Sequence, residues 1–272
     1  MSLPQKSSRA SFNSGFTLVE LTIVLVIVAL LAGGMLVTLS TSRDIASERE
    51  TQKQLASINE ALLGFSAGQG RLPCPATATS TGRESYCTNS SGGCGIELFA
   101  AQTHGRCTDF FNGFVPAAAL GLSPTDVQGF AIDAWGNRLR YAVSDKTAGL
   151  INYPFTTPSG IKTAWAIDPS QIQPDLRVCN TAANITAAGS ATADCLIAAD
   201  QLTNSAVAAV FSTGRNGGAA PPVGNSDELA NWTTSNDRVF VSASPSATFD
   251  DIVVWLSPNI LYNRMISAGR LP

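Results

Sequence analysis

The stretch "GFTLVELTIVLVIVALLAGG", residues 15–34, is almost wholly apolar and carries a single charged side chain, Glu20. From Phe16 to Leu39 there are 24 residues, and Glu20 is the only charged residue among them. A helix rises ~1.5 Å per residue, so these residues would extend ~36 Å, which is enough to cross a bilayer. The sequence therefore predicts a transmembrane helix over residues 16–39, with a carboxylate close to its start.

Residues 1–15 form a polar leader that contains Lys6 and Arg9 and no acidic residue. Positive charge of this kind holds a segment on the cytoplasmic side of a membrane. The apolar core of an ordinary secretory signal has only ~7–15 residues and ends at an A-x-A-like cleavage site, which is not evident in this sequence. We therefore expect the apolar helix to be retained as a membrane anchor.

Residues 40–66 are charged, yet Leu55, Ile58, Leu62 and Phe65 recur at helical spacing within them. The sequence predicts that the apolar helix continues without a break into an amphipathic half. The helix should end at "GFSAGQGRLPCP", residues 64–75, where glycine and proline are frequent.

Residues 67–272 shift to a composition rich in Gly, Ser, Thr, Ala and Asn, with short apolar runs between turn signals. We expect one α+β head with an antiparallel sheet packed on the amphipathic half of the helix. Residues 77–95 and 224–237 read as loops. The predicted strands are rich in Val, Phe, Tyr and Trp and are "LRYAVS" (139–144), "AVAAVFS" (206–212), "RVFVSAS" (238–244) and "DIVVWLS" (251–257).

The six cysteines all follow the apolar stretch, and their even number and irregular spacing favour disulfides in an oxidising compartment. Spacing alone leaves 15 connectivities open. We prefer two local pairs that staple loops with little core of their own, and one pair that ties the end of the helix to the start of the sheet. The three preferred pairs are Cys87 with Cys94, Cys179 with Cys195, and Cys74 with Cys107.

"GFTLVE" directly before a long apolar helix resembles the class III signal of type IV pilins and type II secretion pseudopilins. In that family a prepilin peptidase cuts after the glycine and methylates the new amino terminus. The resemblance implies a cut between Gly15 and Phe16, an N-methylated Phe16, and a Glu20 that pairs with the amine of a neighbouring subunit in a helical filament. The fold it implies is pilin-like, with a long N-terminal helix packed on an antiparallel sheet.

"DAWGNRLRY", residues 133–141, resembles the Asp-x-Trp-Gly-x-x-x-x-Tyr segment of major pseudopilins, where it forms a turn that leads into a strand. "FSTGRNG" (211–217) and "DDIVVW" (250–255) resemble the C-terminal part of such heads. Two features depart from the usual subunit. Many type IV pilins have a proline where this chain has Val37, and the large head with its many cysteines favours a minor subunit.

Related pseudopilins hold calcium in a loop that follows a similar Ser-x-Gly-x-x-Gly stretch. The polar side chains between the predicted strands 206–212 and 238–244 suggest a calcium hypothesis here, since calcium takes ~6–8 oxygen ligands. A solvated polar loop without a cofactor is the alternative reading. The candidate ligands are Asn225, Asp227, Glu228, Asn236 and Asp237.

The sequence does not favour an enzyme or a nucleic-acid-binding domain. His104 is the only histidine, no nucleophile motif surrounds it, and we expect it to be a loop residue. No C-x-x-C pair occurs, which argues against structural zinc. The formal net charge is -3, and the basic residues are scattered rather than clustered.

We therefore expect a non-enzymatic pilin-like subunit, first in the inner membrane with a periplasmic head and then in a periplasmic or cell-surface filament. Its expected partners are other pilin or pseudopilin subunits, the prepilin peptidase and an inner-membrane assembly platform, with a surface, DNA or protein ligand at the head. The alternative is a membrane-anchored periplasmic binding or hydrolytic domain that uses residues 16–39 only as an anchor.

Overall fold

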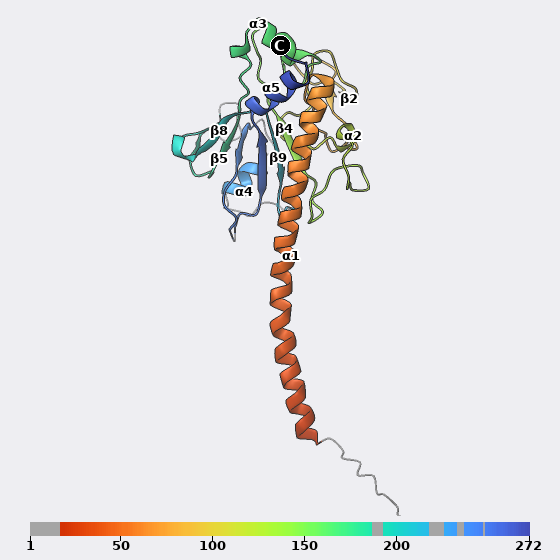
Figure 1. Cartoon of the computed structure of the whole chain (residues 1–272), viewed down its shortest axis with the longest axis vertical. Helices are drawn as coiled ribbons and strands as arrows, with labels where there is room; N and C mark the ends of the chain where they lie inside the picture. The colour runs from red at the N-terminus through yellow and green to blue at the C-terminus, as the bar shows by residue number, and fades with distance from the viewer. Residues whose placement is uncertain (1–16, 187–192, 218–225, 233–236, 247) are drawn as a thin grey trace, which may run out of the picture. The chain divides into compact units, whose positions relative to one another are not determined.

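The computed structural model describes residues 17–186, 193–217, 226–232, 237–246 and 248–272, and for residues 32–42 it describes the backbone alone (Figure 1). The chain divides into two compact units, Met1–Ala46 and Ser47–Pro272, which we describe separately.

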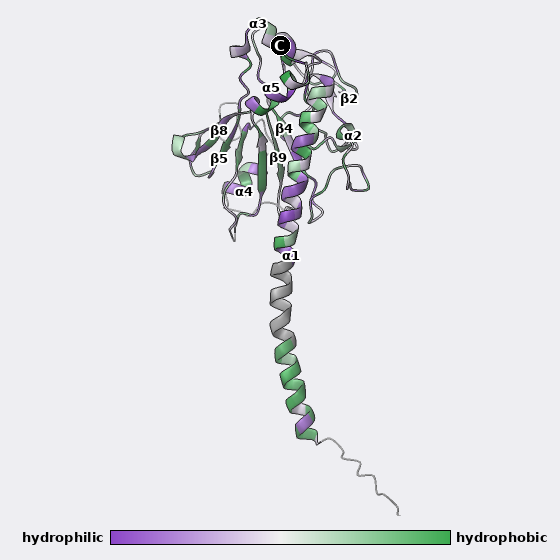
Figure 2. Cartoon of the chain, viewed as in Figure 1, coloured by the Kyte–Doolittle hydropathy of each residue, from purple (hydrophilic) through white to green (hydrophobic). Residues whose placement is uncertain are grey.

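A single long helix, α1, spans Leu18–Gln69. Its backbone stays helical through Gly33 and Gly34. In the first unit, the described side chains from Thr17 to Leu31 are all exposed, and Figure 2 shows most of this stretch as hydrophobic. From residue 43 onward, polar and apolar residues alternate along the helix (Figure 2), as the sequence pattern predicts.

The end of α1 has a clear physical cause. Gly70 follows the last helical residue with a φ of +72°, a left-handed conformation that glycine adopts at little cost, and its N–H donates to the Ser66 carbonyl at 2.8 Å. Arg270, close to the C-terminus, donates to the carbonyls of Ala67 and Gly68. These contacts satisfy carbonyl groups that the last turn of a helix leaves without partners.

The second unit contains short strands and helices around two main sheets. The strands are β1 (Tyr86–Cys87), β2 (Glu97–Leu98), β3 (Gly113–Phe114), β4 (Arg140–Val143), β5 (Leu176–Cys179), β6 (Ile185–Thr186), β7 (Asp194–Cys195), β8 (Gln201–Ala206), β9 (Ala208–Ser212), β10 (Val239–Val241) and β11 (Ile252–Leu256). The helices are α2 (Ala117–Leu120), α3 (Gly160–Ile167), α4 (Ser226–Asn231) and α5 (Pro258–Ser267), with 3₁₀ turns at Pro169–Gln171 and Ala198–Asp200.

The larger sheet has the strand order β11-β9-β4-β3, and all of its pairings are antiparallel. The smaller sheet has the order β10-β5-β8. Two-stranded hairpins join β1 to β2 and β6 to β7. Each of the four predicted strand segments contains a strand of these sheets, and the head is α+β as expected.

The central strand β9 is buried along its whole length. Because successive side chains of a strand point to opposite faces, Val210 and Phe211 enter different cores. Val210 belongs to the cluster that contains Leu55, Ile58 and Leu62 of α1. Phe211 belongs to a second cluster with Val178 of β5 and Phe240 of β10. Residues 47–69 of α1, the larger sheet and the smaller sheet therefore form three successive layers.

Charged side chains join the two sheets at one end. Arg238, directly before β10, contacts the carboxylates of Asp175 and Asp145, and the Asp145 contact is 3.5 Å long. Asp175 directly precedes β5, and Asp145 lies just after β4. The Ser144 hydroxyl also donates to Asp175, at 2.7 Å. One guanidinium thus holds ends of strands from both sheets.

Three details of the head differ from the sequence prediction. Strand β10 pairs with β5 in parallel, so the smaller sheet is mixed rather than antiparallel. The predicted loop 224–237 contains helix α4, which has Asp227 and Glu228 in its first turn; acidic residues stabilise that end of a helix. The predicted loop 77–95 contains β1, whose residues Tyr86 and Cys87 are buried. The pairing of β10 with β5 joins segments that are distant in the sequence, whereas α4 and β1 depend on β10 and β2, the next strands along the chain.

A buried ion pair fixes the segment that follows α1. Arg71 is 5% exposed and donates two hydrogen bonds to Glu84, at 2.6 and 3.0 Å. Glu84 also accepts hydrogen bonds from the Tyr86 hydroxyl and the Cys74 N–H. The guanidinium lies 5.0 Å from the centre of the Phe65 ring. The end of α1 and the first disulfide-bearing loop therefore depend on one carboxylate.

We predict that Glu84→Gln lowers the free energy of unfolding by about 3–5 kcal/mol, because it leaves the Arg71 charge buried without its partner. Denaturant unfolding of an oxidised head that begins at Ser47 measures this. The matched control is Glu60→Gln, which breaks the Arg264–Glu60 pair of nearly equal length, 2.7 Å, whose side chains are 48% and 68% exposed. The control should cost about 1 kcal/mol or less. Equal losses in the two variants would contradict the prediction.

Candidate functional site

The first candidate site is the beginning of α1. Glu20 lies in the first helical turn and is exposed, and its N–H donates to the Thr17 hydroxyl at 3.2 Å. Within the described part of the chain, its carboxylate has no hydrogen-bond or ion-pair partner. Gly15 and Phe16, the predicted processing residues, lie outside the described residues. A carboxylate at this position is able to bind an amine.

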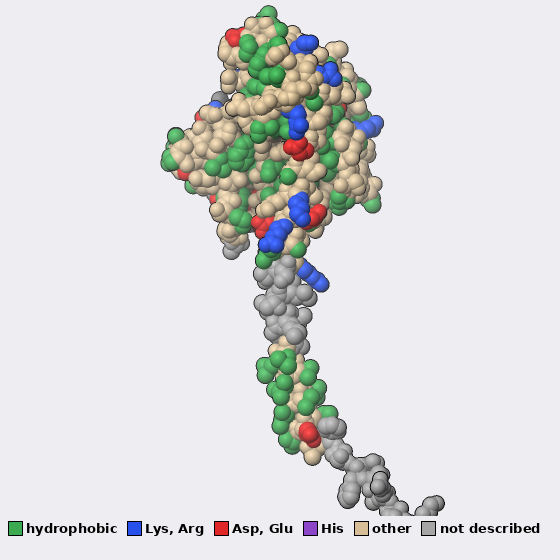
Figure 3. Space-filling model, viewed as in Figure 1, with side chains coloured by type: hydrophobic (Ala, Val, Ile, Leu, Met, Phe, Trp, Pro, Cys, Tyr) green, Lys and Arg blue, Asp and Glu red, His purple; other side chains and the backbone are tan. Residues whose placement is uncertain are grey.

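Hydrophobic side chains cover the described part of α1 near Glu20 (Figure 3). Leu18 is 80% exposed, and Leu30 is 72% exposed. Among the helices of the described residues, none has a stretch long and apolar enough to cross a membrane. The membrane anchor remains a prediction from the sequence.

The second candidate site is a cluster of three carboxylates in the head, formed by Glu228 of α4 with Asp250 and Asp251. One carboxylate oxygen from each lies within 4.8 Å of the others. Asn216 donates to both oxygens of Glu228 at 3.1 Å, and Asn231 donates to Asp251 at 2.8 Å. Asn231 also bonds the N–H and the carbonyl of Val241, both at 2.8 Å, so its amide connects the cluster to the end of β10.

The electrostatics of this cluster disfavour three negative charges. Burial raises the pKa of Asp251 to about 7, and repulsion from Glu228 and Asp250 adds to the effect. Burial also raises the pKa of Asp250, again with repulsion from Glu228. Glu228 is 4% exposed and Asp251 is 6% exposed. Arg215 partly offsets the repulsion at Asp250, since its charge lowers the pKa of that carboxylate. Three hard oxygen ligands that repel one another suit a divalent cation such as calcium.

The structure does not bring the predicted calcium ligands together at one site. Glu228 is in the cluster. Asp227 accepts hydrogen bonds from Thr181 and Ala182, and Asp237 accepts one from the Val239 N–H. Asn225 and Asn236 lie outside the described residues. Sequence reasoning missed Asp250 and Asp251; the available signal was a pair of adjacent acidic residues directly before the last strand.

The turn at Asp133 connects this region to α1. Asp133 is buried, and its carboxylate accepts the N–H groups of Trp135 and Asn137, at 2.9 and 2.8 Å, and the Ser212 hydroxyl at 2.6 Å. The neighbouring Ala134 N–H donates to the buried Thr51 hydroxyl of α1 at 3.2 Å. Asp133 therefore holds its own turn and the end of β9, while the adjacent residue contacts the helix.

The loop after β9 passes close to the carboxylate cluster. The Ser212 oxygen accepts the Gly214 N–H at 3.1 Å, and Asn137 donates to the Gly214 carbonyl at 2.6 Å. Gly214 has a φ of +66°, and a side chain there would place its Cβ 2.1 Å from the nearer Asp250 oxygen. Glycine is thus required both by the backbone conformation and by the close approach of Asp250.

The six cysteines form three disulfides in the structure: Cys74–Cys107, Cys87–Cys94 and Cys179–Cys195. These are the pairs preferred in the sequence analysis. Cys74–Cys107 joins the segment after α1 to the segment before β3. Cys179–Cys195 joins the end of β5 to β7.

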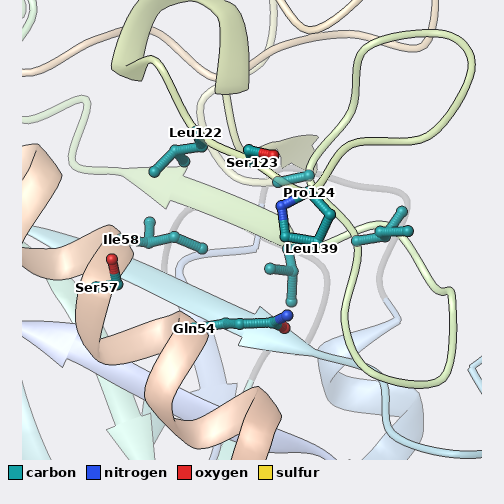
Figure 4. Close-up of a pocket in the computed structure, with 9 residues that line it drawn as sticks. Gln54, Ser57, Ile58, Leu122, Ser123, Pro124 and Leu139 are labelled. Carbon is teal, nitrogen blue, oxygen red and sulfur yellow. The ribbon is translucent and has the colours of Figure 1, made fainter.

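Two other features offer less chemistry. His104 lies in a turn, and its Nδ1 accepts the Arg106 N–H at 3.0 Å. A cleft of about 60 Å³ lies beside α1 and is lined by Gln54, Ser57 and Ile58 on one side and by Leu122, Ser123 and Pro124 on the other (Figure 4). Ligand pockets usually measure ~300–1,000 Å³, so this cleft has room for a side chain rather than for a small-molecule ligand.

Comparison with known proteins finds one match, at the beginning of the chain. Residues 11–36 match the family described as the prokaryotic N-terminal methylation motif. This is the class III prepilin-type signal of type IV pilins and pseudopilins. No curated protein and no solved structure matches the chain. The motif supports a type IV pilin-like or pseudopilin-like subunit that is processed by prepilin peptidase and assembles with other pilin subunits.

We predict that stability of the head falls between pH 5 and pH 8 when divalent cations are chelated. The folded-state pKa of Asp251, about 7, lies above the value of ~3.9 expected in the unfolded chain. Its stabilising contribution is therefore fully present below about pH 4 and is lost as the pH rises through about 7. Asp251→Asn should match the wild type in stability below about pH 4, and its advantage over the wild type should grow by on the order of 3 kcal/mol between pH 5 and pH 8.

Denaturant unfolding at several pH values tests this. The matched control is Asp168→Asn, since Asp168 is a carboxylate whose pKa is lowered by hydrogen bonds from Ser170. This control should keep the wild-type pH dependence between pH 5 and pH 8. A constant difference between Asp251→Asn and the wild type at all pH values would contradict the prediction.

Proposed function

We propose that this protein is a minor pilin-like structural subunit of a type IV pilus or a type II secretion pseudopilus. The observation that carries the proposal is the match of residues 11–36 to the methylation motif. That motif spans the beginning of α1, where the described side chains are exposed and, apart from Thr17, Glu20 and Thr22, apolar. An exposed apolar helix needs either lipid or other apolar helices around it, and a filament subunit meets both in turn.

Processing would occur between Gly15 and Phe16. Cleavage there removes Lys6 and Arg9, which hold the leader on the cytoplasmic face, and it creates a charged amine on Phe16 that is then methylated. A charged group inside a membrane costs ~2.5–3.5 kcal/mol on insertion scales, so the amine needs a partner. Glu20 is the acidic residue nearest to it in the sequence.

We assign Glu20 to subunit assembly. Its carboxylate is exposed and has no partner among the described residues. In the proposed filament it binds the N-terminal amine of a neighbouring subunit, which neutralises both charges and sets the axial stagger between the two apolar helices. The helix then acts first as an inner-membrane anchor with a periplasmic head, and later as part of the filament core.

Two features support a minor rather than a major subunit. The head is large and carries three disulfides.

The Asp133 turn favours the secretion pseudopilus, and the disulfide-rich head favours the type IV pilus. The head would bind a surface, DNA or a protein, and the remaining partners are the prepilin peptidase and the assembly platform. The alternative is a membrane-anchored periplasmic binding or hydrolytic domain.

The Glu20→Ala variant distinguishes the filament subunit from the membrane-anchored domain. We predict that the variant is cleaved and methylated, so that its mature mass corresponds to residues 16–272 plus one methyl group and three disulfides. It should be absent from sheared filaments, because the neighbouring amine loses its partner. Mass spectrometry and co-purification with filaments measure the two effects.

The matched control is Glu48→Ala, which removes another carboxylate of α1, a partly exposed one that accepts a hydrogen bond from Gln52. This control should enter filaments as the wild type does. An intact leader in the wild type would contradict the proposed processing. If the Glu20→Ala chain stays in the membrane and its head keeps a wild-type binding or hydrolytic activity without any filament, the anchor alternative is favoured.

We further propose that the head binds calcium at Glu228, Asp250 and Asp251. The support is the proximity of three carboxylates, two of them buried. Burial and mutual repulsion raise the pKa of Asp250 and Asp251, and among the described basic side chains only Arg215 offsets the repulsion, at Asp250. Calcium would hold α4 against the segment before β11. With an affinity in the ~10⁻⁴–10⁻³ M range of extracellular modules, the ion would be bound at millimolar concentrations.

We predict that 10 mM calcium raises the Tm of the head by roughly 3–10 °C at pH 7.5, from mass-action stabilisation of about 1.4–2.7 kcal/mol. Asp250→Asn should remove most of the shift, and Asp168→Asn should keep it. Magnesium at the same concentration is the ion control. The absence of any calcium-dependent shift in the wild type would exclude the site.

A further inference from the structure

Thr17 is the last residue before α1 and has the geometry of a helix N-cap. Its hydroxyl oxygen accepts the Glu20 N–H at 3.2 Å, and its carbonyl accepts the Leu21 N–H at 3.2 Å. An N-cap residue lies outside the helix, accepts the first helical hydrogen bond with its carbonyl, and accepts the N–H of the second or third helical residue with its side chain. Glu20 is the third residue of α1, so both contacts are those of an N-cap.

The spacing Thr17-x-x-Glu20 is that of a capping box. In a complete box the glutamate side chain reaches back to the N–H of the cap residue. In the described residues only the hydroxyl half is formed, because the Glu20 carboxylate makes no hydrogen bond to Thr17 or to any other described residue. The cap therefore orders the backbone of Glu20 and leaves its carboxylate available.

We propose that Thr17 is the positioning residue for Glu20 in subunit assembly. Its hydroxyl fixes the start of the helix at Leu18 and so holds the Glu20 carboxylate in the first turn, where it can bind the amine of a neighbouring subunit. The inference rests on the proposed function. It assigns to Thr17 a role separate from recognition by the peptidase.

Apolar surroundings make this hydroxyl important. The first four N–H groups of a helix have no helical partner, and water normally satisfies those that a cap does not. Water is scarce around a helix embedded in lipid or in a bundle of apolar helices, so an N–H group without a partner is costly there. Without the Thr17 hydroxyl the first turn frays, and Glu20 loses its fixed position in that turn.

The test compares Thr17→Val with Thr17→Ser and Thr17→Asn in the full chain. Valine keeps the shape of threonine but lacks the acceptor, whereas serine and asparagine are efficient N-caps. The matched control is Thr22→Val. Thr22 lies deeper in the same helix, and its hydroxyl donates to the Val19 carbonyl at 2.8 Å instead of accepting an N–H.

Three readouts are needed: the intact mass, the hydrogen-exchange rate of the Glu20 amide in the processed chain in detergent micelles, and recovery in sheared filaments. We expect all variants to be cleaved and methylated. In Thr17→Val the Glu20 amide should exchange about fivefold faster, the ratio that corresponds to a typical N-cap contribution of ~1 kcal/mol. Its recovery in filaments should fall by a similar factor or more. The serine, asparagine and Thr22→Val chains should match the wild type.

The outcomes separate the inference from the function on which it rests. An unchanged Glu20 exchange rate or unchanged filament recovery in Thr17→Val overturns the positioning role alone. So does a Thr17→Ser chain that fails like Thr17→Val, since a hydroxyl acceptor at this position would then not be sufficient. A Thr17→Val chain that keeps its leader places the role in processing instead and also overturns the inference. A wild-type chain that never enters filaments overturns the proposed function as well.

Discussion

The burial of β9 on both faces is the constraint on which the head depends. Val210 faces the cluster built with α1, and Phe211 faces the cluster shared with β5 and β10. A strand buried in this way has to be apolar except where a polar side chain finds a hydrogen-bond partner, and all five residues of β9 are buried. The polar residue at its end, Ser212, donates to Asp133, whose turn contacts Thr51 of α1 through Ala134. One strand therefore aligns the helix, the larger sheet and the loop beside the carboxylate cluster.

The carboxylates of the chain fall into two groups that suggest different roles. Glu84 and Asp133 are buried and satisfied, the first by Arg71, Tyr86 and Cys74 and the second by its turn and Ser212. Such groups hold the structure together. The Glu20 carboxylate has no partner in the described part of the chain, and the carboxylates of Glu228, Asp250 and Asp251 repel one another with only Arg215 acting against that repulsion, at Asp250. Uncompensated charge is costly, so these positions are candidates for binding an amine or a metal ion.

Local sequence signals were sufficient for some parts of this structure. The run from Leu18 to Gln69 lacks proline and changes from an apolar to an amphipathic pattern, and it forms one helix. Gly70 ends that helix as its conformation allows. The apolar runs at β4, β9, β10 and β11 were identified because β-branched and aromatic residues are concentrated in them. The methylation motif is likewise formed by neighbouring residues, so the sequence alone is sufficient to identify it.

Other parts depend on residues that are far apart in the sequence. The parallel pairing of β10 with β5 brings residues 239–241 beside residues 177–179, and no local pattern distinguishes parallel from antiparallel pairing in strands this short. Helix α4 was missed because six residues provide little periodicity, and its stability comes from contacts such as Asn231 with Val241. The carboxylate cluster was only partly anticipated for the same reason, since Glu228 and Asp250 are separated by a whole strand.

By itself, the sequence determined the chemistry at the start of the chain: an apolar helix, one carboxylate in its first turn and a processing motif before it. These features are set by residues within one or two turns of each other. Tertiary structure decided which carboxylates of the head are neutralised and which are not. That outcome depends on which strands and loops fold against one another, because burial and distance determine the free energy of a charge.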